Sequence, residues 1–401
     1  MKELSAMALA VKQSSTLSIT AKAKELRAQG LNVIGFGAGE PDFDTPEHIG
    51  RAGIEAIEAG FTKYTPGAGI EELRKAICKK LKEDNGLDYE FSQIIISNGA
   101  KHSLNNILTA LLNPGDEVIV PCPFWLSYPE MVKMAGGIPK ILMTEEADGF
   151  RVTRAQLDKS LSPATKAIII NSPNNPTGVV YDEATLRVIA DFAVENDLYV
   201  ISDEIYEKLI YDDDLRHISI ASFSEELYRR TIVVNGLSKS YSMTGWRIGY
   251  TASPKEIAKV MSNLQGHGTS NPNSIAQKAA LAALQGDQSP IELMRQAFQK
   301  RRDYIYERAM AIPHITAVKP QGAFYLFINV SALFGRAVKG VQVKNAGDLA
   351  ELLLTEQNVA VVPCGDFGSD RHIRLSYAIS MEEIQQGMDR IEAFVREHYS
   401  V

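Results

Sequence analysis

Cysteine is scarce in this sequence, and the few cysteines are badly placed for cross-links or metal binding. Cys78, Cys122 and Cys364 are the only three in 401 residues, and no two of them form a CxxC pair. An odd number of widely spaced cysteines argues against a disulfide framework and against a zinc site. We therefore expect reduced thiols in a cytoplasmic protein, and we expect no metal ion.

Long apolar runs and a basic excess are also missing. No run approaches the roughly 18 apolar residues that cross a bilayer, and residues 1–5 lack the basic-then-apolar pattern of a signal peptide. The chain has 42 basic and 49 acidic residues, a formal net charge of -7, and no basic block. These features argue against a membrane or a nucleic acid as partner. The hydrophobic content of 45% suffices for a sizeable core.

Short apolar runs alternate with amphipathic stretches from Gln93 onward. Strands are expected over 93–97, 117–120, 167–171, 198–202 and 231–235, and helices over 101–112 and 183–195. The first of these helices has apolar residues at the spacing of one helical face, as in Leu104, Ile107 and Leu108. The alternation predicts an α/β domain with a mostly parallel sheet flanked by helices.

The pattern changes after about Pro290. A long charged helix is expected over 291–310, short strands over 323–330, 359–362 and 372–376, and a closing helix over 381–399. A helix over 21–29 precedes the sheet and is expected to join this C-terminal part. We predict a large domain, 46–290, and a smaller α+β domain built from 1–45 and 291–401.

Lys239 stands just past the expected strand 231–235. Arg247 follows eight residues later, between Gly245 and Gly249, which let a backbone approach a ligand. Such a lysine is ambiguous alone. Beside an anion site, however, a lysine that forms a Schiff base is typical of pyridoxal phosphate chemistry.

Polar groups also follow the neighbouring strands, where ligands bind in open parallel sheets. Asn175 follows strand 167–171, and Asp203 and Tyr206 follow strand 198–202. Taken singly, these residues have ordinary structural interpretations as a turn, a helix cap and a packing residue. Together with Lys239 they fit one cofactor.

Pyridoxal phosphate needs this set of groups. Asp203 can hold a proton on the pyridine nitrogen, and Asn175 and Tyr206 can bond the ring oxygen. Lys239 forms the imine and then moves a proton between carbon atoms. For the phosphate, we expect Arg247 and the start of the helix after strand 93–97, with its residues Gly99, Ala100 and Lys101.

One glycine-rich stretch suggests a different cofactor. Residues 33–41, VIGFGAGEP, loosely match a dinucleotide-binding fingerprint. Pro41 interrupts the point where the helix of that motif should begin. We interpret the stretch instead as a loop whose backbone passes close to a ligand.

Three motifs carry a family resemblance: SPNNPTG at 172–178, SDEIYE at 202–207 and SKSYSMTGWRIGY at 238–250. The chain resembles, over essentially its whole length, the fold-type I pyridoxal-phosphate aminotransferases of class I, and among them the bacterial aspartate aminotransferase branch. The resemblance implies that Lys239 is the Schiff-base lysine and that Asp203 and Tyr206 act with it in catalysis.

The resemblance also implies roles for residues outside these motifs. Trp125 would stack on the cofactor and contact substrate, and Arg374 would take the substrate α-carboxylate, with Asn175 beside it. The backbone at Gly39 would approach the substrate. Tyr64 would reach the phosphate in the neighbouring subunit, which implies a homodimer with shared active sites.

One position departs from the family pattern. Many relatives carry a serine three residues before the lysine, where this chain has Gly236. Phosphate binding would then depend on Arg247, the helix start near Ala100 and other donors, among which Ser238 is a weak candidate.

The implied reaction moves an amino group from L-aspartate to 2-oxoglutarate, giving oxaloacetate and L-glutamate in a ping-pong cycle. Lys101 would meet the side-chain carboxylate, and Ser14, Ser15 and Thr16 lie in a segment that closes over substrate in relatives. Alternatives remain: an aminotransferase for aromatic or other amino acids or for prephenate, or a β-lyase on the same fold. A regulator on this fold is disfavoured, because no helix-turn-helix pattern precedes the sheet.

Overall fold

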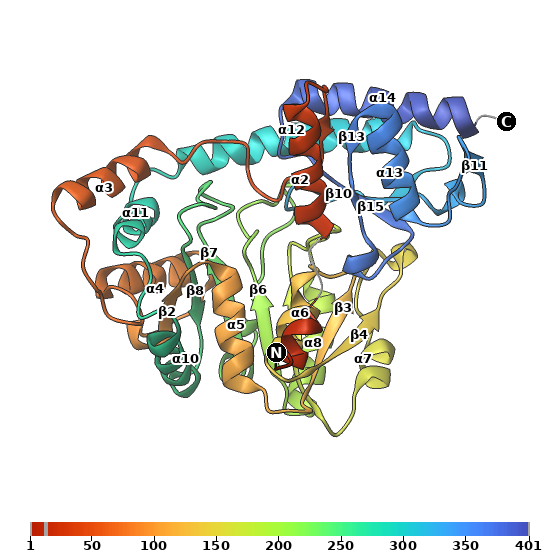
Figure 1. Ribbon diagram of the computed structural model, residues 1–401. Helices are drawn as coiled ribbons and strands as arrows, with labels where there is room; N and C mark the ends of the chain where they lie inside the picture. Colours follow the sequence, from red (N-terminus) through yellow and green to blue (C-terminus); the bar gives the residue numbers. More distant parts are fainter. Residues whose placement is uncertain (1, 12–14, 400–401) are drawn as a thin grey trace.

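A seven-stranded sheet organises the larger part of the molecule (Figure 1). The computed structural model describes residues 2–11 and 15–399. The strand order is β2-β8-β7-β6-β5-β3-β4, and β8 runs in the direction opposite to the other six strands. The strands are β2 (Ile94–Ser97), β3 (Glu117–Cys122), β4 (Ile138–Met143), β5 (Thr165–Asn171), β6 (Tyr199–Asp203), β7 (Thr231–Gly236) and β8 (Gly249–Ala252). The predicted α/β class with a mostly parallel sheet is confirmed.

Helices cover both faces of this sheet, which explains the apolar runs in its strands. Ile168 and Ile170 of β5 pack with one helical layer, whereas Ile169 points to the opposite one. The helices of this part are α3 (Glu47–Glu58), α4 (Glu71–Asn85), α5 (Ala100–Leu111), α6 (Ser127–Met134), α7 (Arg154–Ser160), α8 (Glu183–Glu195), α9 (Glu225–Tyr228), α10 (Lys255–Gly268) and α11 (Ser274–Gln285). Short 3₁₀ turns are η1 (Phe91–Gln93), η2 (Glu146–Asp148) and η3 (Ile220–Ser222).

A four-stranded sheet of order β14-β15-β10-β9 organises the C-terminal part. Its strands are β9 (Thr316–Ala317), β10 (Tyr325–Asn329), β14 (Val362–Pro363) and β15 (His372–Ser376). Around it lie α12 (Ser289–Met310), η4 (Ser331–Leu333), β11 (Ala337–Val338), β12 (Val341–Gln342), α13 (Ala346–Gln357), β13 (Val359–Ala360), η5 (Gly365–Phe367) and α14 (Met381–Tyr399).

The N-terminal residues contribute α1 (Ala6–Leu9), α2 (Ser15–Ala28) and β1 (Ile34–Gly35). Strand β1 pairs in parallel with β13, so this segment contacts the C-terminal part. The exact domain boundaries stay a prediction. In the part of the chain that the structure describes, no helix is long and apolar enough to cross a membrane.

Two expected strands differ in the structure. The expected strand 359–362 is split into β13 and β14, because the first pairs with β1 and the second with β15. The expected strand 323–330 begins only at Tyr325, because Ala323 has a left-handed backbone (φ 56°) that a strand cannot continue. The bounds expected for α8, β15 and α14 match the structure.

Candidate active site

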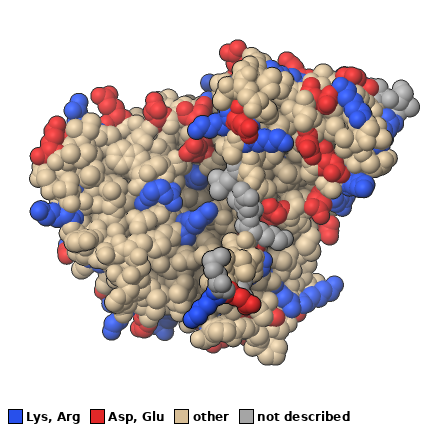
Figure 2. Space-filling view, viewed as in Figure 1, with Lys and Arg blue, Asp and Glu red and all other residues tan. Residues whose placement is uncertain are grey.

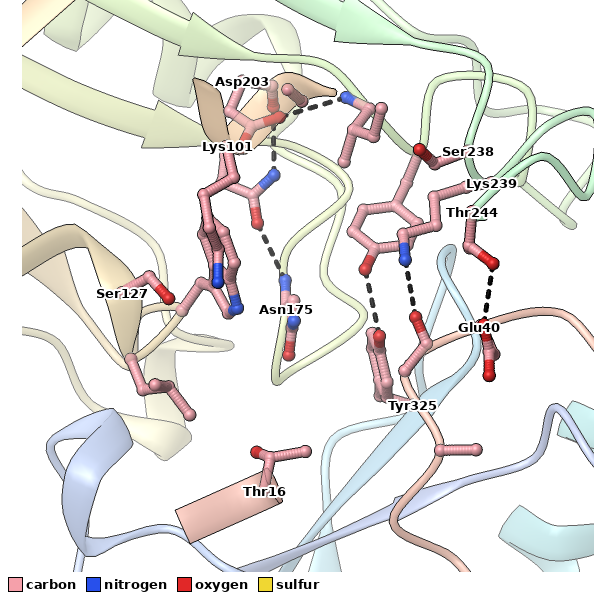
Figure 3. A pocket seen from close by; sticks show the side chains of 18 of the residues that line it. Thr16, Glu40, Lys101, Ser127, Asn175, Asp203, Ser238, Lys239, Thr244 and Tyr325 are labelled. Carbon is pink, nitrogen blue, oxygen red and sulfur yellow. Dashed lines mark hydrogen bonds between the residues drawn. The ribbon is translucent and has the colours of Figure 1, made fainter. Parts of the chain in front are cut away.

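One cavity of about 510 Å³ opens where the carboxyl ends of β5 and β6 face β10 and β15 (Figure 3). Basic side chains flank this hollow on the face shown in Figure 2. The predicted site residues that line the cavity are Gly39, Ala100, Lys101, Trp125, Asn175, Asp203, Tyr206, Lys239, Arg247 and Arg374. The structure therefore brings together residues that are up to 335 positions apart, from Gly39 to Arg374.

Lys239 lies at the inner wall of the cavity. Its Nζ donates a hydrogen bond to the Gly39 carbonyl at 2.5 Å (Figure 3). Burial lowers the pKa of Lys239 to about 8; the charge of Glu40 opposes this shift, and Arg247 and Arg374 add to it. An amine with a pKa near neutrality can both accept and return a proton.

Asp203 is buried at the end of β6 and accepts a hydrogen bond from a hydroxyl group of α6. Tyr128 donates to its Oδ2 at 2.7 Å, and the backbone N–H of Ile205 donates to its Oδ1 at 3.2 Å. Burial raises the pKa of Asp203 to about 6, although the bond from Tyr128 partly lowers it. The carboxylate is thus charged at neutral pH and is aimed into the cavity.

Arg374 is almost fully buried, with 2% of its surface exposed. Its Nη1 donates to Asn175 Oδ1 at 3.0 Å, and its Nη2 donates to the Gly37 carbonyl at 3.3 Å. The guanidinium lies 4.3 Å from the ring centroid of Tyr325, and its Nε has no hydrogen-bond partner among the described residues. Tyr325 in turn shares a 3.0 Å hydrogen bond with the hydroxyl of Tyr206.

Arg247 bridges the loop after Lys239 and the turn before α5. It donates to the Thr244 carbonyl at 2.9 Å and to the Asn98 carbonyl at 3.3 Å. Gly99, with φ 87°, fits here because a Cβ would lie 2.4 Å from Arg247 Nη2. Gly99 itself does not line the cavity. Because it has no side chain, Arg247 can lie against the start of α5 at the edge of the cavity.

Lys101 projects from the first turn of α5 toward Trp125, with its Nζ 4.8 Å from the indole ring (Figure 3). Desolvation lowers the pKa of Lys101, and Arg247 adds to this effect. Between residues 2–11 and 15–399, no carboxylate forms an ion pair with Lys101, Lys239, Arg247 or Arg374. Four cations without paired carboxylates make the cavity a site for anions.

Gly236 replaces the expected serine for a reason of packing. It pairs with Gly249 of β8, and a Cβ on Gly236 would lie 2.9 Å from the Ile248 carbonyl. A side chain would therefore push β7 from β8. Ser238, by contrast, is buried and lines the cavity.

Tyr64 is not part of this cavity. Its side chain is 89% exposed. Two buried glutamines hold its loop: Gln265 donates to the Gly67 carbonyl at 2.6 Å, and Gln277 donates to Thr65 Oγ1 at 3.0 Å. A role for Tyr64 in a neighbouring subunit stays a prediction.

The N-terminal segment contributes one predicted residue to the cavity. Thr16 lines it, whereas Ser15 does not. Ser14 lies outside the described residues.

Tyr128, Tyr325 and Glu40 are among the lining residues that the sequence interpretation missed. Tyr128 lies one helical turn after Trp125, so its spacing could have revealed it. Tyr325 and Glu40 gave no local signal. Glu40 accepts a hydrogen bond from Thr244 at 2.7 Å, across 204 residues of sequence.

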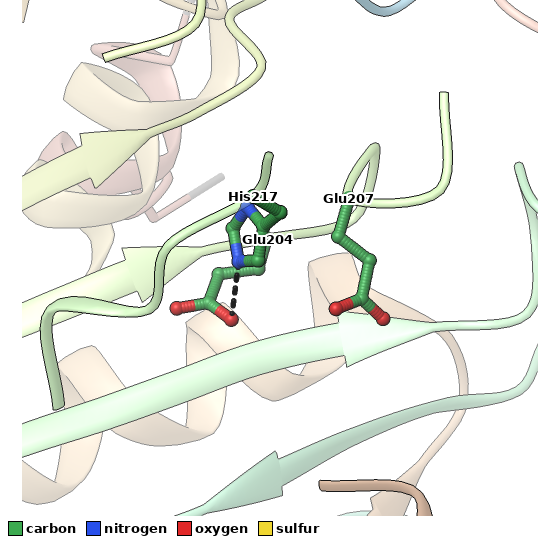
Figure 4. Close-up of side chains that lie close together, drawn as sticks. All are labelled: Glu204, Glu207 and His217. Carbon is green, nitrogen blue, oxygen red and sulfur yellow. Dashed lines mark ion pairs between the residues drawn. The ribbon is translucent and has the colours of Figure 1, made fainter. Parts of the chain in front are cut away.

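A second group of titratable side chains consists of Glu204, Glu207 and His217, which lie close together (Figure 4). Their ligand atoms lie within 4.8 Å of one another, a spacing that a metal ion could bridge. Protein cations already balance both carboxylates, because His217 Nε2 lies 2.9 Å from Glu204 and Lys80 pairs with Glu207. The predicted site therefore needs no metal at this position.

The fold and the cavity together define an aminotransferase. Residues 32–391 match the family model of aminotransferase class I and II, and the chain belongs to that family. The predicted family and enzyme class are confirmed.

Individual relatives extend this comparison. The chain is 50% identical to an aspartate aminotransferase of Geobacillus stearothermophilus over 382 residues, 95% of this chain and 96% of that protein. It is 45% identical to an aspartate/prephenate aminotransferase of Cereibacter sphaeroides over 386 residues, 96% of each. The crystal structure of the aspartate aminotransferase from Rhizobium meliloti gives a TM-score of 0.94 at 39% identity and covers 98% of each chain.

Proposed function

We propose that this chain is a cytoplasmic aminotransferase that moves the amino group of L-aspartate to 2-oxoglutarate with pyridoxal 5'-phosphate as cofactor. The products are oxaloacetate and L-glutamate, formed in two half-reactions of a ping-pong cycle. The observation that carries the proposal is one cavity that is lined by Lys239, Arg247 and Arg374 together with the buried carboxylate of Asp203. The full-length similarity to aspartate aminotransferases supports it.

The residues present fit this cofactor. The cavity offers an amine of lowered pKa in Lys239, a buried carboxylate in Asp203 and, beside the start of α5, the cation of Arg247, which forms no ion pair with a described carboxylate. When bound, pyridoxal phosphate supplies a ring that withdraws electrons from the carbon bearing the amino group. The residues that would hold it are Lys239, Asn175, Asp203, Tyr206, Trp125, Arg247, Gly99, Ala100, Lys101 and, from a second subunit, Tyr64.

Lys239 would carry the proton transfer. Because its pKa is about 8, a sizeable fraction of the amine is neutral near pH 7 to 8 and can take a proton from the substrate α-carbon. Asp203 stays ionised above pH about 6 and would stabilise positive charge on the ring nitrogen of the bound cofactor. The hydroxyl of Tyr206 shares a hydrogen bond with the hydroxyl of Tyr325, in which either oxygen can be the donor, and this contact would hold it beside the ring oxygen.

Arg374 and Lys101 would bind the two carboxylates of the substrate. The planar guanidinium of Arg374 suits a bidentate contact with the α-carboxylate, and Asn175 and Gly39 border the same space. Lys101 would meet the side-chain carboxylate at the mouth of the cavity. A substrate with two carboxylates would thus supply counter-ions to cations that form no ion pair with the carboxylates the structure describes.

A homodimer is part of this proposal. Tyr64 is 89% exposed, and the exposed apolar residues Ile54 (47%) and Ile57 (55%) lie on α3 of the same part of the chain. Exposed apolar side chains of this kind suit an interface. In such a dimer Tyr64 would complete the partner's phosphate site.

Prephenate is a second candidate substrate. Relatives named aspartate/prephenate aminotransferase match the chain at 45% identity, and prephenate also carries two carboxylates. It would use the same pair of cations, Arg374 and Lys101. A β-lyase activity has no comparable support.

The test is a single-turnover comparison on the purified protein loaded with pyridoxal phosphate. Conversion should be fast with aspartate, slower with alanine, tyrosine and cystathionine, and prephenate should be assayed as amino acceptor. Lys239→Ala should lose the visible cofactor absorbance and at least roughly 10²- to 10⁴-fold in rate. A colourless protein that takes up no pyridoxal phosphate would refute the proposal, and equal rates for aspartate and alanine would refute the acidic substrate.

A further inference from the structure

One carboxylate outside the cavity receives hydrogen bonds from three adjacent strands. Glu146 lies in turn η2, which follows β4 of the large sheet. Its Oε1 accepts from Thr316 Oγ1 at 3.0 Å, and its Oε2 accepts from Asn329 Nδ2 at 2.6 Å. The ring Nε2 of His372 lies 3.3 Å from the same Oε2.

The three donors form a single row across β9, β10 and β15. Asn329 is the register partner of Thr316 on one side and of His372 on the other. Glu146, which lies in a connection of the large sheet, thus binds three residues that are paired side by side in the C-terminal sheet. The hydrogen bond from His372 is the main reason that the pKa of Glu146 is lowered to about 2, against the effect of desolvation. Glu146 is therefore charged at any working pH.

Aromatic packing reinforces the same contact. The imidazole of His372 stacks on Phe327 with ring centroids 4.1 Å apart and planes 4° from parallel. Phe150, four residues after Glu146, meets the edge of Phe327 at 5.6 Å. His372 also contacts Ser369 Oγ at 2.6 Å through its Nδ1. The ring is thus fixed on both sides.

His372 and Arg374 are two residues apart in β15, so they lie on the same face, roughly 7 Å apart along the strand. Phe327, which stacks on His372, is the register partner of Arg374. The guanidinium of Arg374 packs on the ring of Tyr325, and its hydrogen bonds to described residues go to two neutral acceptors, Asn175 and the Gly37 carbonyl. Its position therefore depends on where β15 is fixed.

We propose that Glu146 is a positioning residue that fixes β15 through His372 and Asn329 and so places Arg374 for the substrate carboxylate. The inference rests on the proposed function, in which Arg374 binds that carboxylate. Glu146 touches neither substrate nor cofactor, since it does not line the cavity. Its loss should weaken carboxylate binding more than it slows the chemical step.

The experiment compares Glu146→Ala and Glu146→Gln with Asp148→Ala in the holoenzyme. Asp148 is an exposed carboxylate of the same turn, and among the described residues its side chain accepts no hydrogen bond. We expect Glu146→Ala to raise the KM for aspartate and the Kd of succinate about 10-fold, because the variant loses the hydrogen bonds to one charged group. The kcat should change less than about 3-fold. The KM and Kd of Glu146→Gln should lie between those of the unmodified enzyme and Glu146→Ala, because one acceptor oxygen remains. The cofactor absorbance and the Asp148→Ala enzyme should be unchanged.

A double-mutant cycle tests the route through Arg374. If Glu146 acts by placing Arg374, then Glu146→Ala should weaken succinate binding less than about 2-fold in an Arg374→Ala background. A full further loss of about 10-fold there would overturn the inference. Should Glu146→Ala fail to fold, Asn329→Ala and Glu146→Gln replace it in the same cycle.

The same data separate the two proposals. If Arg374→Ala leaves succinate binding unchanged, the proposed substrate site is wrong. If Arg374→Ala weakens succinate binding and the Glu146 variants do not, only the positioning role of Glu146 is refuted.

Discussion

The hydroxyl of Tyr128 donates a 2.7 Å hydrogen bond to the Oδ2 of Asp203, and both residues line the cavity. Burial alone would leave this carboxyl harder to ionise, since it raises the pKa of Asp203 to about 6 even with Tyr128 present. The tyrosine thus helps Asp203 to remain an anion where the proposed cofactor needs one.

Tyr128→Phe should weaken the binding of pyridoxal phosphate by roughly 10-fold, the usual effect of losing a hydrogen bond to a charged group. Without that donor the pKa of Asp203 rises further, so the loss should be larger at pH 6 than at pH 8. The measurement is the Kd of pyridoxal phosphate by absorbance at both pH values. Tyr89→Phe is the matched control, because the Tyr89 hydroxyl is buried and has no hydrogen-bond partner within residues 2–11 and 15–399. An equal loss at both pH values would contradict the role of Asp203 ionisation.

The charge of Glu40 should control how readily Lys239 loses its proton. Burial lowers the pKa of Lys239 to about 8, and Glu40 is the main group that opposes this shift. Uptake of pyridoxal phosphate by the cofactor-free protein needs the neutral amine, so its rate should rise up to pH about 8 and then level off.

Glu40→Gln should move that midpoint to lower pH and speed uptake at pH 7. Thr244→Val removes the hydrogen bond to Glu40 but keeps its charge, and Glu47→Gln removes an exposed charge on α3. Both controls should leave the midpoint close to that of the unmodified protein. Stopped-flow absorbance from pH 6 to 9 gives the midpoint, and a shift to higher pH in Glu40→Gln would show that Glu40 does not support the charged amine.

Lys101 should discriminate between acidic and aromatic substrates. Lys101→Ala should lower kcat/KM for aspartate by roughly 10- to 100-fold, the effect expected for one charge-assisted contact. The value for tyrosine should change less than about 3-fold, because tyrosine has no side-chain carboxylate. Lys159→Ala, an exposed lysine at the end of α7, serves as control. Equal losses for both substrates would remove the proposed role in recognition.

The buried group of Glu204, Glu207 and His217 should make stability depend on pH in two opposite ways. Burial would raise the pKa of Glu207, but Lys80 and then His217 lower it to about 2 from an ordinary 4.5. Its contribution, roughly 3 kcal/mol, is therefore present above pH 4.5 and is lost as the pH falls toward 2. Burial would lower the pKa of His217, but Glu204 raises it above 6.5. That contribution is complete below pH 6.5 and is lost as the pH rises through the raised value.

Thermal unfolding from pH 3 to 9 should thus show greatest stability from this group between about pH 4.5 and 6.5. His217→Gln should flatten the decline above pH 6.5 and lower the Tm below it. His267→Gln, an exposed histidine of α10, should leave the profile unchanged. A His217→Gln protein with the original alkaline decline would show that other groups cause it.

Much of the fold was predictable because its signals are local. The apolar runs of β5 and β7 indicate strands buried on both faces, since helices cover a parallel sheet on both sides. The helix over 183–195 was predicted with the bounds of α8. The split of strand 359–362 was not predictable, because it depends on which distant strand each half joins.

The sequence by itself determined which groups stand at the strand ends. Asp203 is the last residue of β6, Asn175 and Lys239 follow β5 and β7, and parallel strands bring their ends to one edge. Only the tertiary structure decided which groups meet them there. The contacts of Tyr128 with Asp203 and of Glu146 with the strand of Arg374 join residues 75 to 226 positions apart. Such contacts depend on how sheets and helices pack, and no periodicity along the chain encodes them.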